Sequence, residues 1–344
     1  MTKVPSQPSP VAEPRWQVGE TPWQSLPPLV RQRLRGIVDN DFSGDPDDLY
    51  QLAHHLLSPS IELTTVVGSH LRPNDPLDAG PDTATNAVAV LKDLFARMGL
   101  TSTELIVQGS NQALADTQTP QPAPAVDAIL AEARREDPRP LYFLAGGGLT
   151  DLASALLTDP AVAERMTLVW IGGNEHPELA APPPDQMPIE YNLLIDVKAA
   201  QYVFNHSGIT IWQVPRDVYR QCLVSEAELR ARVATAGPLG RYLYDETAAV
   251  IAEASRPDRP AGETYALGDS PLVLLSALQA QFGADPSSSR YVVKPTPSIN
   301  DKGSYTERPD ARPMRIYTWV DTRLMFEDLY AKLREFGTWQ SSAQ

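Results

Sequence analysis

Apolar runs of strand length alternate with longer segments of helical periodicity over most of the chain. Strand-like runs occupy residues 62–68, 141–144 and 167–171, and helix-like spacing of apolar residues covers roughly 46–57 and 82–98. The alternation continues through 37–38, 105–108, 149–157, 197–204, 209–212, 242–254 and 270–281. Because strands that alternate with helices are typical of βαβ units, we predict an α/β fold with a mostly parallel, Rossmann-like sheet flanked by helices.

The 33 prolines gather in a few stretches, which are 5–14, 119–124, 182–184, 256–260 and 295–313. Proline interrupts helices and sheets, so these stretches mark loops. We predict a disordered leader over residues 1–15. Residues 16–344 show neither an internal repeat nor a linker between two cores, which predicts a single domain.

Composition narrows the partners and the compartment. A formal net charge of −14 opposes binding to polyanions, so we expect neither nucleic acid nor an anionic membrane as a partner. Cys222 is the single cysteine, which excludes an intramolecular disulfide. The N-terminus lacks the apolar region of a secretory signal, and no apolar run is long enough to span a bilayer. We therefore expect a cytoplasmic protein.

The strongest local signal is an acidic loop. Five carboxylates lie within ten residues, after a short apolar run and before a predicted helix, namely Asp39, Asp41, Asp45, Asp47 and Asp48. Like charges at this density raise one another's pKa unless a cation neutralises them. Oxygen-only ligands suit Ca²⁺ or Mg²⁺, and a flexible loop with many oxygens favours Ca²⁺. The loop therefore predicts a divalent metal site at the end of a strand.

Three other interpretations fit this loop less well. An EF-hand counted from Asp39 needs glutamate at its twelfth position, where Tyr50 stands. A phosphatase-type Asp-x-Asp site needs a further acidic pair far downstream, whereas the pair here lies in the same loop. A solvated turn with Asp45 as helix N-cap and Pro46 in the first helical position leaves four carboxylates without a role.

Further polar residues follow the later strands, and in a parallel sheet the ligand site lies at the carboxyl ends of the strands. The residues at these ends are the glycines 146–148, Asn174, Glu190, Asn192 and Asp269. Acids and amides with almost no lysine suit a neutral polyol such as a sugar better than a phosphate. Three of these features also have a purely local interpretation: the glycines as a tight turn, Asn174 as a left-handed turn residue and Asp269 as a helix N-cap.

Four segments together resemble the inosine-uridine preferring nucleoside hydrolase family, over about residues 35–333. The loop 39–48 is similar to the family's Asp-x-Asp, Pro-Gly and Asp-Asp signature, although it is two residues longer. Residues 64–68 resemble a strand that ends in Gly-Asn, and 145–153 with Asp159 and Pro160 resemble a Gly-Pro-Leu-Thr-Asn turn and its helix. Residues 190–196 are similar to the family's Glu-Phe-Asn segment. The order and spacing of the four segments make the resemblance specific.

The resemblance implies an enzyme of purine or pyrimidine salvage that hydrolyses the N-glycosidic bond of a ribonucleoside or related N-riboside. The products are free base and ribose. It implies a Ca²⁺ site made by Asp41, Asp48, the backbone carbonyl of Gly146 and Asp269. Asp41 is also implied as the catalytic base that takes a proton from the attacking water. Family members form dimers or tetramers, so the resemblance further implies a homo-oligomer.

The implied substrate site contains Asp47, Glu190 and Asn192, which would hold ribose hydroxyls, together with Ser69 and Asn174. Ser69 stands where the family commonly has a ribose-binding asparagine. The side-chain amide of Asn174 would replace the amide that is missing at Ser69.

One further departure concerns the leaving base. Gly268 stands where many family members have the histidine that protonates it. His70, Tyr265 and Trp319 are replacements on position only; we expect His70 as an exposed loop residue and the two aromatics in the core. The alternative function is therefore a non-catalytic, metal-dependent sugar- or nucleoside-binding relative that has lost this acid.

Overall fold

The computed structural model describes residues 15–24, 26, 29–185, 187–255, 260–281 and 287–342. The predicted leader, 1–15, lies outside the described residues except for Arg15. Eight strands form one central sheet in the order β3-β2-β1-β4-β5-β6-β12-β9. Their bounds are β1 Leu34–Asn40, β2 Ile61–Gly68, β3 Ile106–Gln108, β4 Leu141–Ala145, β5 Thr167–Ile171, β6 Thr210–Val214, β9 Ser289–Pro295 and β12 Pro313–Val320.

All neighbouring strands of the sheet run parallel except β12 and β9, which pair antiparallel at one edge. The α/β class with a mostly parallel sheet is therefore confirmed. Strand β1 is buried over its whole length, which is typical of a strand covered by helices on both faces. Two short hairpins lie outside the sheet, formed by β7 Leu223–Ser225 with β8 Thr264–Ala266 and by β10 Ser298–Ile299 with β11 Tyr305–Thr306.

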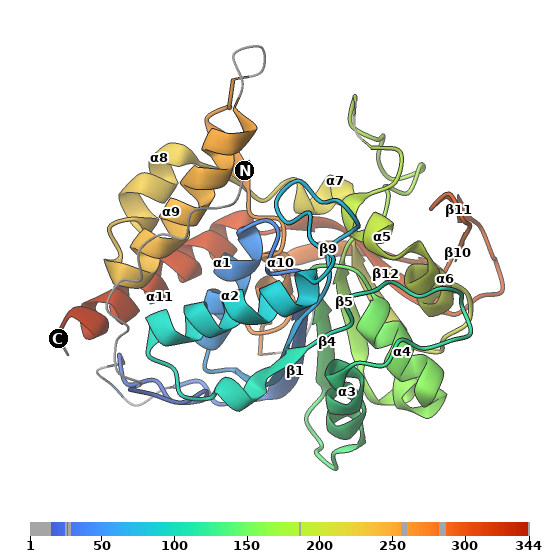
Figure 1. Ribbon diagram of the computed structural model, residues 1–344, viewed down its shortest axis with the longest axis horizontal. Helices are drawn as coiled ribbons and strands as arrows, with labels where there is room; N and C mark the ends of the chain where they lie inside the picture. The colour runs from blue at the N-terminus through green and yellow to red at the C-terminus, as the bar shows by residue number, and fades with distance from the viewer. Residues whose placement is uncertain are drawn as a thin grey trace.

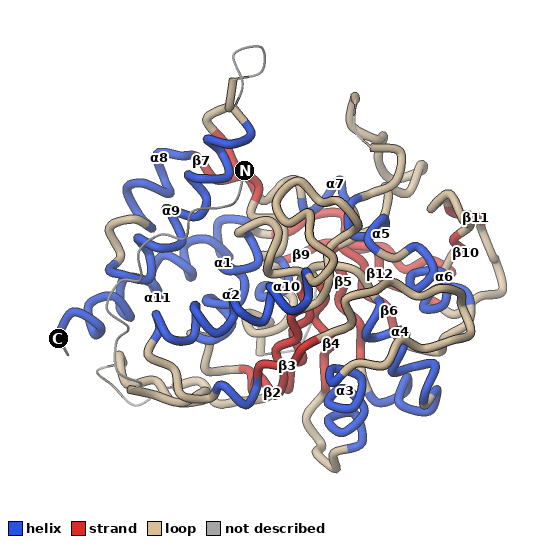
Figure 2. Tube along the Cα trace, in the orientation of Figure 1, coloured by secondary structure: helices blue, strands red, loops and turns tan. Residues whose placement is uncertain are grey.

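Helices cover both faces of the sheet, as Figures 1 and 2 show. One layer contains α1 Asp47–Leu56, α2 Thr83–Met98, α9 Gly237–Ala254 and α11 Thr322–Ser342. The opposite layer contains α3 Pro124–Arg134, α4 Thr150–Thr158 and α6 Val197–Asn205. Buried apolar residues form two clusters, one beneath each layer. The shorter helices are α5 Tyr191–Ile195, α7 Arg216–Tyr219, α8 Glu226–Glu228 and α10 Pro271–Leu274.

The chain order of the strands reverses beside β1, and this reversal places the site. From β1 the chain proceeds to β2 and β3 on one side, while β4, β5 and β6 extend the sheet on the other. The loops that leave the carboxyl ends of β1 and β4 therefore diverge at the boundary between these two strands. In open parallel sheets, ligands bind in the crevice at such a switch point.

Two parts of the sequence prediction differ from the structure. The last apolar segment of the predicted alternation, 270–281, was expected to continue the helix that Asp269 would cap, and this expectation is wrong: α10 ends at Leu274, and Leu278 N then bonds to Val273 O, one residue beyond α-helical spacing. The Ser276 hydroxyl donates to Leu272 O at 2.6 Å and pairs with His55 Nε2 at 2.8 Å. These side-chain bonds favour a turn over a continued helix. Helices α3 and α11 and strands β9 and β12 were not predicted.

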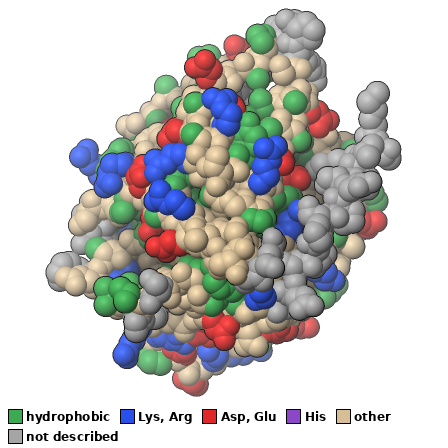
Figure 3. Space-filling model, turned by 90° about the vertical axis from the view of Figure 1, so that its left-hand side faces the viewer, with side chains coloured by type: hydrophobic (Ala, Val, Ile, Leu, Met, Phe, Trp, Pro, Cys, Tyr) green, Lys and Arg blue, Asp and Glu red, His purple; other side chains and the backbone are tan. Residues whose placement is uncertain are grey.

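Two features of the molecule concern possible partners: the distribution of surface charge and the polarity of the helices. On the face shown in Figure 3, basic and acidic side chains are interspersed. Within the described part of the chain, every helix is too short or too polar to cross a lipid bilayer.

Candidate active site

A cavity of about 200 Å³ lies at the carboxyl ends of the strands, beside the boundary between β1 and β4. Six carboxylates line it: Asp41, Asp45, Asp47, Asp48, Glu190 and Asp269. Of the described residues that line it, none is a lysine or arginine. Six acids without a basic partner favour a cationic occupant over an anionic one.

Three of these acids come within coordination distance of a single ion. Asp47, Asp48 and Asp269 each offer an oxygen, and these oxygens all lie within 4.8 Å of one another. Asp47 and Asp48 open α1, whereas Asp269 precedes α10 from far along the chain. The family resemblance implied Asp47 for the sugar and Asp41 for the metal, whereas the structure groups Asp47 with Asp48 and Asp269. Asp41 lines the same cavity but lies outside this group of three.

The glycine loop after β4 is shaped by these carboxylates. A Cβ at residue 146 would overlap Asp269 Oδ2, and a Cβ at residue 147 would lie 3.0 Å from Asp41 Oδ1. Glycine therefore lets the backbone approach the acids closely. The Gly146 carbonyl accepts a hydrogen bond from Asn192 Nδ2 at 2.7 Å, so the loop is held by the predicted sugar-binding segment as well.

Asn40, which the sequence analysis did not single out, ties the acidic groups together. Its Nδ2 lies 2.9 Å from Asp269 Oδ2 and 3.2 Å from Asp48 Oδ1, while its Oδ1 accepts from Gly146 N at 2.7 Å. The side chain is fully buried. A single amide therefore positions two carboxylates and the glycine loop before any ion arrives.

Burial among like charges raises the pKa of every acid in the group. Burial raises the pKa of Asp41 to about 8, and neighbouring carboxylates add to the effect. Burial first, and other acids second, raise the pKa values of Asp47, Asp48 and Asp269 well above the usual range. Asp48 Oδ2 is buried without a hydrogen-bond partner among the described residues. Hard oxygen donors, one of them orphaned, fit a divalent cation such as Ca²⁺.

Glu190 and Asn192 enter the cavity from the start of α5. Glu190 caps this helix by accepting from the backbone N–H groups of Asn192 and Leu193, and it also accepts from Gly173 N at 2.7 Å. Both hydrogens of the Asn192 amide are directed to carbonyls, those of Gly146 at 2.7 Å and Ile171 at 2.8 Å. Asn192 Oδ1 is therefore the part of this side chain that can accept a hydrogen bond from a ligand hydroxyl.

The other two predicted substrate residues do not line the cavity. Asn174 accepts from Glu190 N at 2.7 Å and donates to the carbonyls of Pro188 and Gly303, so it holds the segment that carries Glu190. Ser69 is buried at the end of β2, and its N–H donates to Asn40 O at 3.0 Å. The structure therefore places both residues behind the lining.

The aromatic and imidazole candidates for the missing acid occupy three different environments. The expectation of an exposed His70 is wrong, because this ring is buried and its Nε2 lies 2.8 Å from Thr150 Oγ1. Tyr265 is half-buried, and its hydroxyl donates to Asp45 at the rim of the cavity. The expectation of Trp319 in the core is also wrong: this side chain is exposed on β12, with the Arg290 guanidinium 5.3 Å from its ring centroid, and it does not line the cavity.

Tyr219 is the residue that lies beside Gly268, and the sequence analysis missed it. A Cβ at residue 268 would lie 3.3 Å from Tyr219 Cδ2 and 3.2 Å from Asp47 Oδ2. The Tyr219 hydroxyl donates to Glu190 Oε1 at 2.9 Å, and burial beside that acid raises its pKa, so the phenol keeps its proton. A tyrosine ring at the cavity wall thus accompanies the absence of a side chain at residue 268.

Comparison with known proteins identifies the family of this chain. The model of the inosine-uridine preferring nucleoside hydrolase family matches residues 37–303. A curated protein of that description from Leishmania major is 32% identical over 104 residues, which is 30% of this chain and 31% of the relative. The chain thus spans about a third of the length of that curated relative.

Solved structures share the fold over much more of the chain. A purine-preferring ribonucleoside hydrolase from Gardnerella vaginalis matches with a TM-score of 0.67 and 19% identity, covering 88% of this chain and 99% of that one. A plant nucleoside hydrolase matches with a TM-score of 0.63 and 20% identity over the same shares.

Proposed function

The chain belongs to the inosine-uridine preferring nucleoside hydrolase family, and from this we propose that it hydrolyses the N-glycosidic bond of a ribonucleoside to give free base and ribose. The observation that carries the proposal is the cavity beside β1 and β4, where six carboxylates and an amide meet without a basic residue. Such a lining suits a sugar held on a cation.

We propose that a divalent cation, Ca²⁺, is held by Asp41, Asp48, the Gly146 carbonyl and Asp269, with Asp47 close enough to contribute. When bound, the cation would supply Lewis acidity that lowers the pKa of a water and offsets the charge of the acids. The grouped oxygens of Asp47, Asp48 and Asp269 and the orphaned Asp48 Oδ2 support a metal at this position, whereas Asp41 and the Gly146 carbonyl are taken from the family resemblance.

Asp41 is proposed as the base. It accepts a proton from the attacking water, and this requires the carboxylate to be ionised. Burial raises its pKa to about 8, so at neutral pH the carboxylate depends on nearby positive charge for ionisation.

Other residues of the acidic cavity are proposed to bind the sugar. Asp47 and Asn192 Oδ1 present acceptors to ribose hydroxyls. The Glu190 oxygens already accept from three backbone N–H groups and the Tyr219 hydroxyl, so this residue contributes negative charge at the sugar site. The same negative groups stabilise the positive charge that develops on the sugar ring in the transition state. Ser69 and Asn174 are assigned supporting positions, because they lie behind the lining.

The second candidate is a relative that binds nucleosides or ribose with a metal but does not turn them over. Gly268, which offers no acid to the departing base, favours this candidate. Tyr219 beside it favours turnover, since its protonated hydroxyl can exchange its hydrogen bond to Glu190 Oε1 for one to a leaving group.

Incubation of the purified protein with a panel of purine and pyrimidine ribonucleosides separates the two. If the protein is a hydrolase, free base and reducing sugar should form in the presence of Ca²⁺, and neither should form after chelation. Stabilisation by Ca²⁺ and ribose without product supports the binding protein. Absence of both product and stabilisation contradicts both candidates. The homodimer or homotetramer that the family resemblance implied and the cytoplasmic location that the sequence analysis expected stay proposals, and light scattering on a sizing column tests the first.

A further inference from the structure

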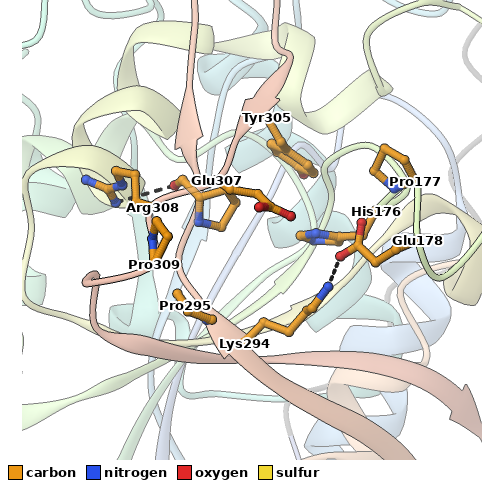
Figure 4. A pocket seen from close by; sticks show the side chains of 10 residues that line it. His176, Pro177, Glu178, Lys294, Pro295, Tyr305, Glu307, Arg308 and Pro309 are labelled. Atoms are coloured by element: carbon orange, nitrogen blue, oxygen red, sulfur yellow. Dashed lines mark hydrogen bonds and ion pairs between the residues drawn. The ribbon is translucent and has the colours of Figure 1, made fainter.

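A second and larger cavity, of about 370 Å³, lies apart from the acidic one. The loop after β5 forms one wall, and β9 with the segment around β10 and β11 forms the other (Figure 4). The two cavities share no lining residue. This volume is typical of sites for small ligands.

The walls of this cavity include several flat ring surfaces. His176 and Tyr305 stack with ring centroids 4.8 Å apart and an angle of 28° between the rings. Tyr305 is fixed by a hydrogen bond from Gln213 Nε2 to its hydroxyl at 2.8 Å, and Phe204 stacks with it at 6.4 Å. Further flat surface comes from Pro177, Pro295, Pro297 and Pro309. Rigid, flat walls suit a planar ring system.

The basic groups of this cavity are already engaged. Lys294 forms an ion pair with Glu178. Arg308 donates to four backbone carbonyls, those of Thr296, Phe204, Asn205 and Pro297. Neither side chain is therefore available in full to bind an anion.

The free polar groups are acceptors. Gln213 Nε2 donates to Gly172 O at 2.9 Å and to Tyr305, so Gln213 Oε1 accepts from His176 Nε2 at 2.9 Å. This arrangement leaves His176 Nδ1 as an acceptor. The Glu307 carboxylate is directed toward His176 in Figure 4 and has no hydrogen bond or ion pair with any described residue.

We propose that this cavity binds a flat heteroaromatic amine, whose ring packs against the prolines and Tyr305 while its amine donates to Glu307 and His176 Nδ1. The six-membered aminated rings of the adenine type fit this description. The inference is independent of the proposed hydrolase activity, because none of these residues lines the acidic cavity.

Calorimetric titration of the full chain tests the proposal with adenine as probe and purine, the same ring system without the exocyclic amine, as its comparison. We expect saturable adenine binding that weakens about tenfold or more in Glu307→Ala, because a hydrogen bond to a charged group is lost. Purine should bind the unmodified chain more weakly by a similar factor. Glu335→Ala, which removes an exposed acid of α11, is the matched control and should bind adenine normally.

A fourth variant distinguishes the two cavities. Asp48→Asn alters the acidic cavity alone, so adenine affinity should stay within twofold. Loss of adenine binding in Asp48→Asn would assign the ligand to the acidic cavity and overturn the proposal. Absence of saturable binding to the unmodified chain, or an unchanged affinity in a folded Glu307→Ala, would overturn it as well.

Discussion

Both ends of the sheet contain clusters of charged residues. At one end the acids are paired with arginines, and at the other they have no basic partner. Arginines and acids gather at the amino ends of β1, β2 and β4, namely Arg35, Glu62, Glu132, Arg135, Asp137 and Arg139. Arg35 Nη1 lies 2.5 Å from Glu132 Oε1, and Arg139 Nη2 lies 2.5 Å from Asp137 Oδ2. Hydrogen bonds from Arg139 lower the pKa of Asp137. Each acid at this end has a basic partner.

At the carboxyl ends, no lysine or arginine is among the described residues that line the acidic cavity, so its six carboxylates have neutral hydrogen-bond donors but no basic partner. Asp48 and Asp269 share the Nδ2 donor of Asn40, and burial raises the pKa values of both. Charge that is balanced by the chain itself can stabilise the fold, whereas unbalanced charge costs stability until something else neutralises it. The contrast assigns structure to one end and function to the other.

The largest effect is expected from Asp41→Asn, which removes the proposed base. Turnover should fall by about two to four orders of magnitude. Thermal stability of the metal-free protein should hold or rise, because a buried acid with a raised pKa is replaced by a neutral amide. Nucleoside hydrolysis and a melting curve on the same sample check both parts. Undiminished turnover would remove Asp41 from the role of base.

Arg35→Met should show the reverse pattern. It removes the buried partner of Glu132, which keeps only the half-exposed Arg135 at 3.0 Å, so we expect a loss of about 1–3 kcal/mol of unfolding free energy. Activity of the folded fraction should change little. The matched control is Arg165→Met, whose pair with Glu136 is exposed and should cost at most about 1 kcal/mol. Equal losses in the two variants would show that the amino-end cluster is not structural.

The acidity of the site predicts how Ca²⁺ and pH act together. The pKa of Asp41 rises from 3.8 to about 8 on folding, so the metal-free folded state holds a proton that the unfolded state releases. Its stabilising contribution is therefore present at low pH and is lost as pH rises toward 8. His54, whose pKa falls from 6.5 to about 4, acts in the opposite direction and only below about pH 6.5.

Melting temperatures between pH 6.5 and 8.5, with Ca²⁺ and with chelator, measure this effect. The chelated protein should lose stability as pH rises, and the stability gained on adding Ca²⁺ should increase over the same range. At a concentration of about a hundred times Kd, that increment is about 2.7 kcal/mol. A Ca²⁺ increment that shrinks with rising pH would contradict the account.

The smallest effect is expected from Tyr219→Phe. It removes the hydroxyl that donates to Glu190 Oε1, which is worth about 0.5–1.5 kcal/mol, or up to about tenfold in kcat/KM. If Tyr219 also donates to the leaving base, the loss should be larger for a natural nucleoside than for an activated riboside whose aglycone needs no proton. Tyr244→Phe, which loses a bond to the surface acid Glu226, is the control. Equal losses on both substrates would limit Tyr219 to holding Glu190.

Local pattern explains what the sequence could predict. Strands β1, β2, β4 and β5 contain apolar runs of strand length, so they could be predicted. The acids of the loop after β1 are close together in sequence, so their clustering could be predicted as well. Helix α11 was not predicted, although its buried apolar residues recur at helical spacing, namely Met325, Leu329, Leu333 and Phe336. These features depend on neighbours a few residues apart.

The missed residues depend on contacts between distant segments. Asn40 lies inside a strand pattern, and its importance comes from Asp269 far along the chain. Tyr219 lies in the short helix α7, and only the fold brings its ring against Gly268. Strand β12 inserts between β6 and the edge strand β9, which no local periodicity can indicate.

Calcium titration by calorimetry on chelator-treated protein tests the central contrast most directly. The unmodified chain and Glu62→Gln, which alters the balanced end, should each bind one ion per chain, and Asp48→Asn should bind none. Undiminished binding by Asp48→Asn, or no binding by the unmodified chain, would contradict the assignment of the metal to the carboxyl ends of the strands.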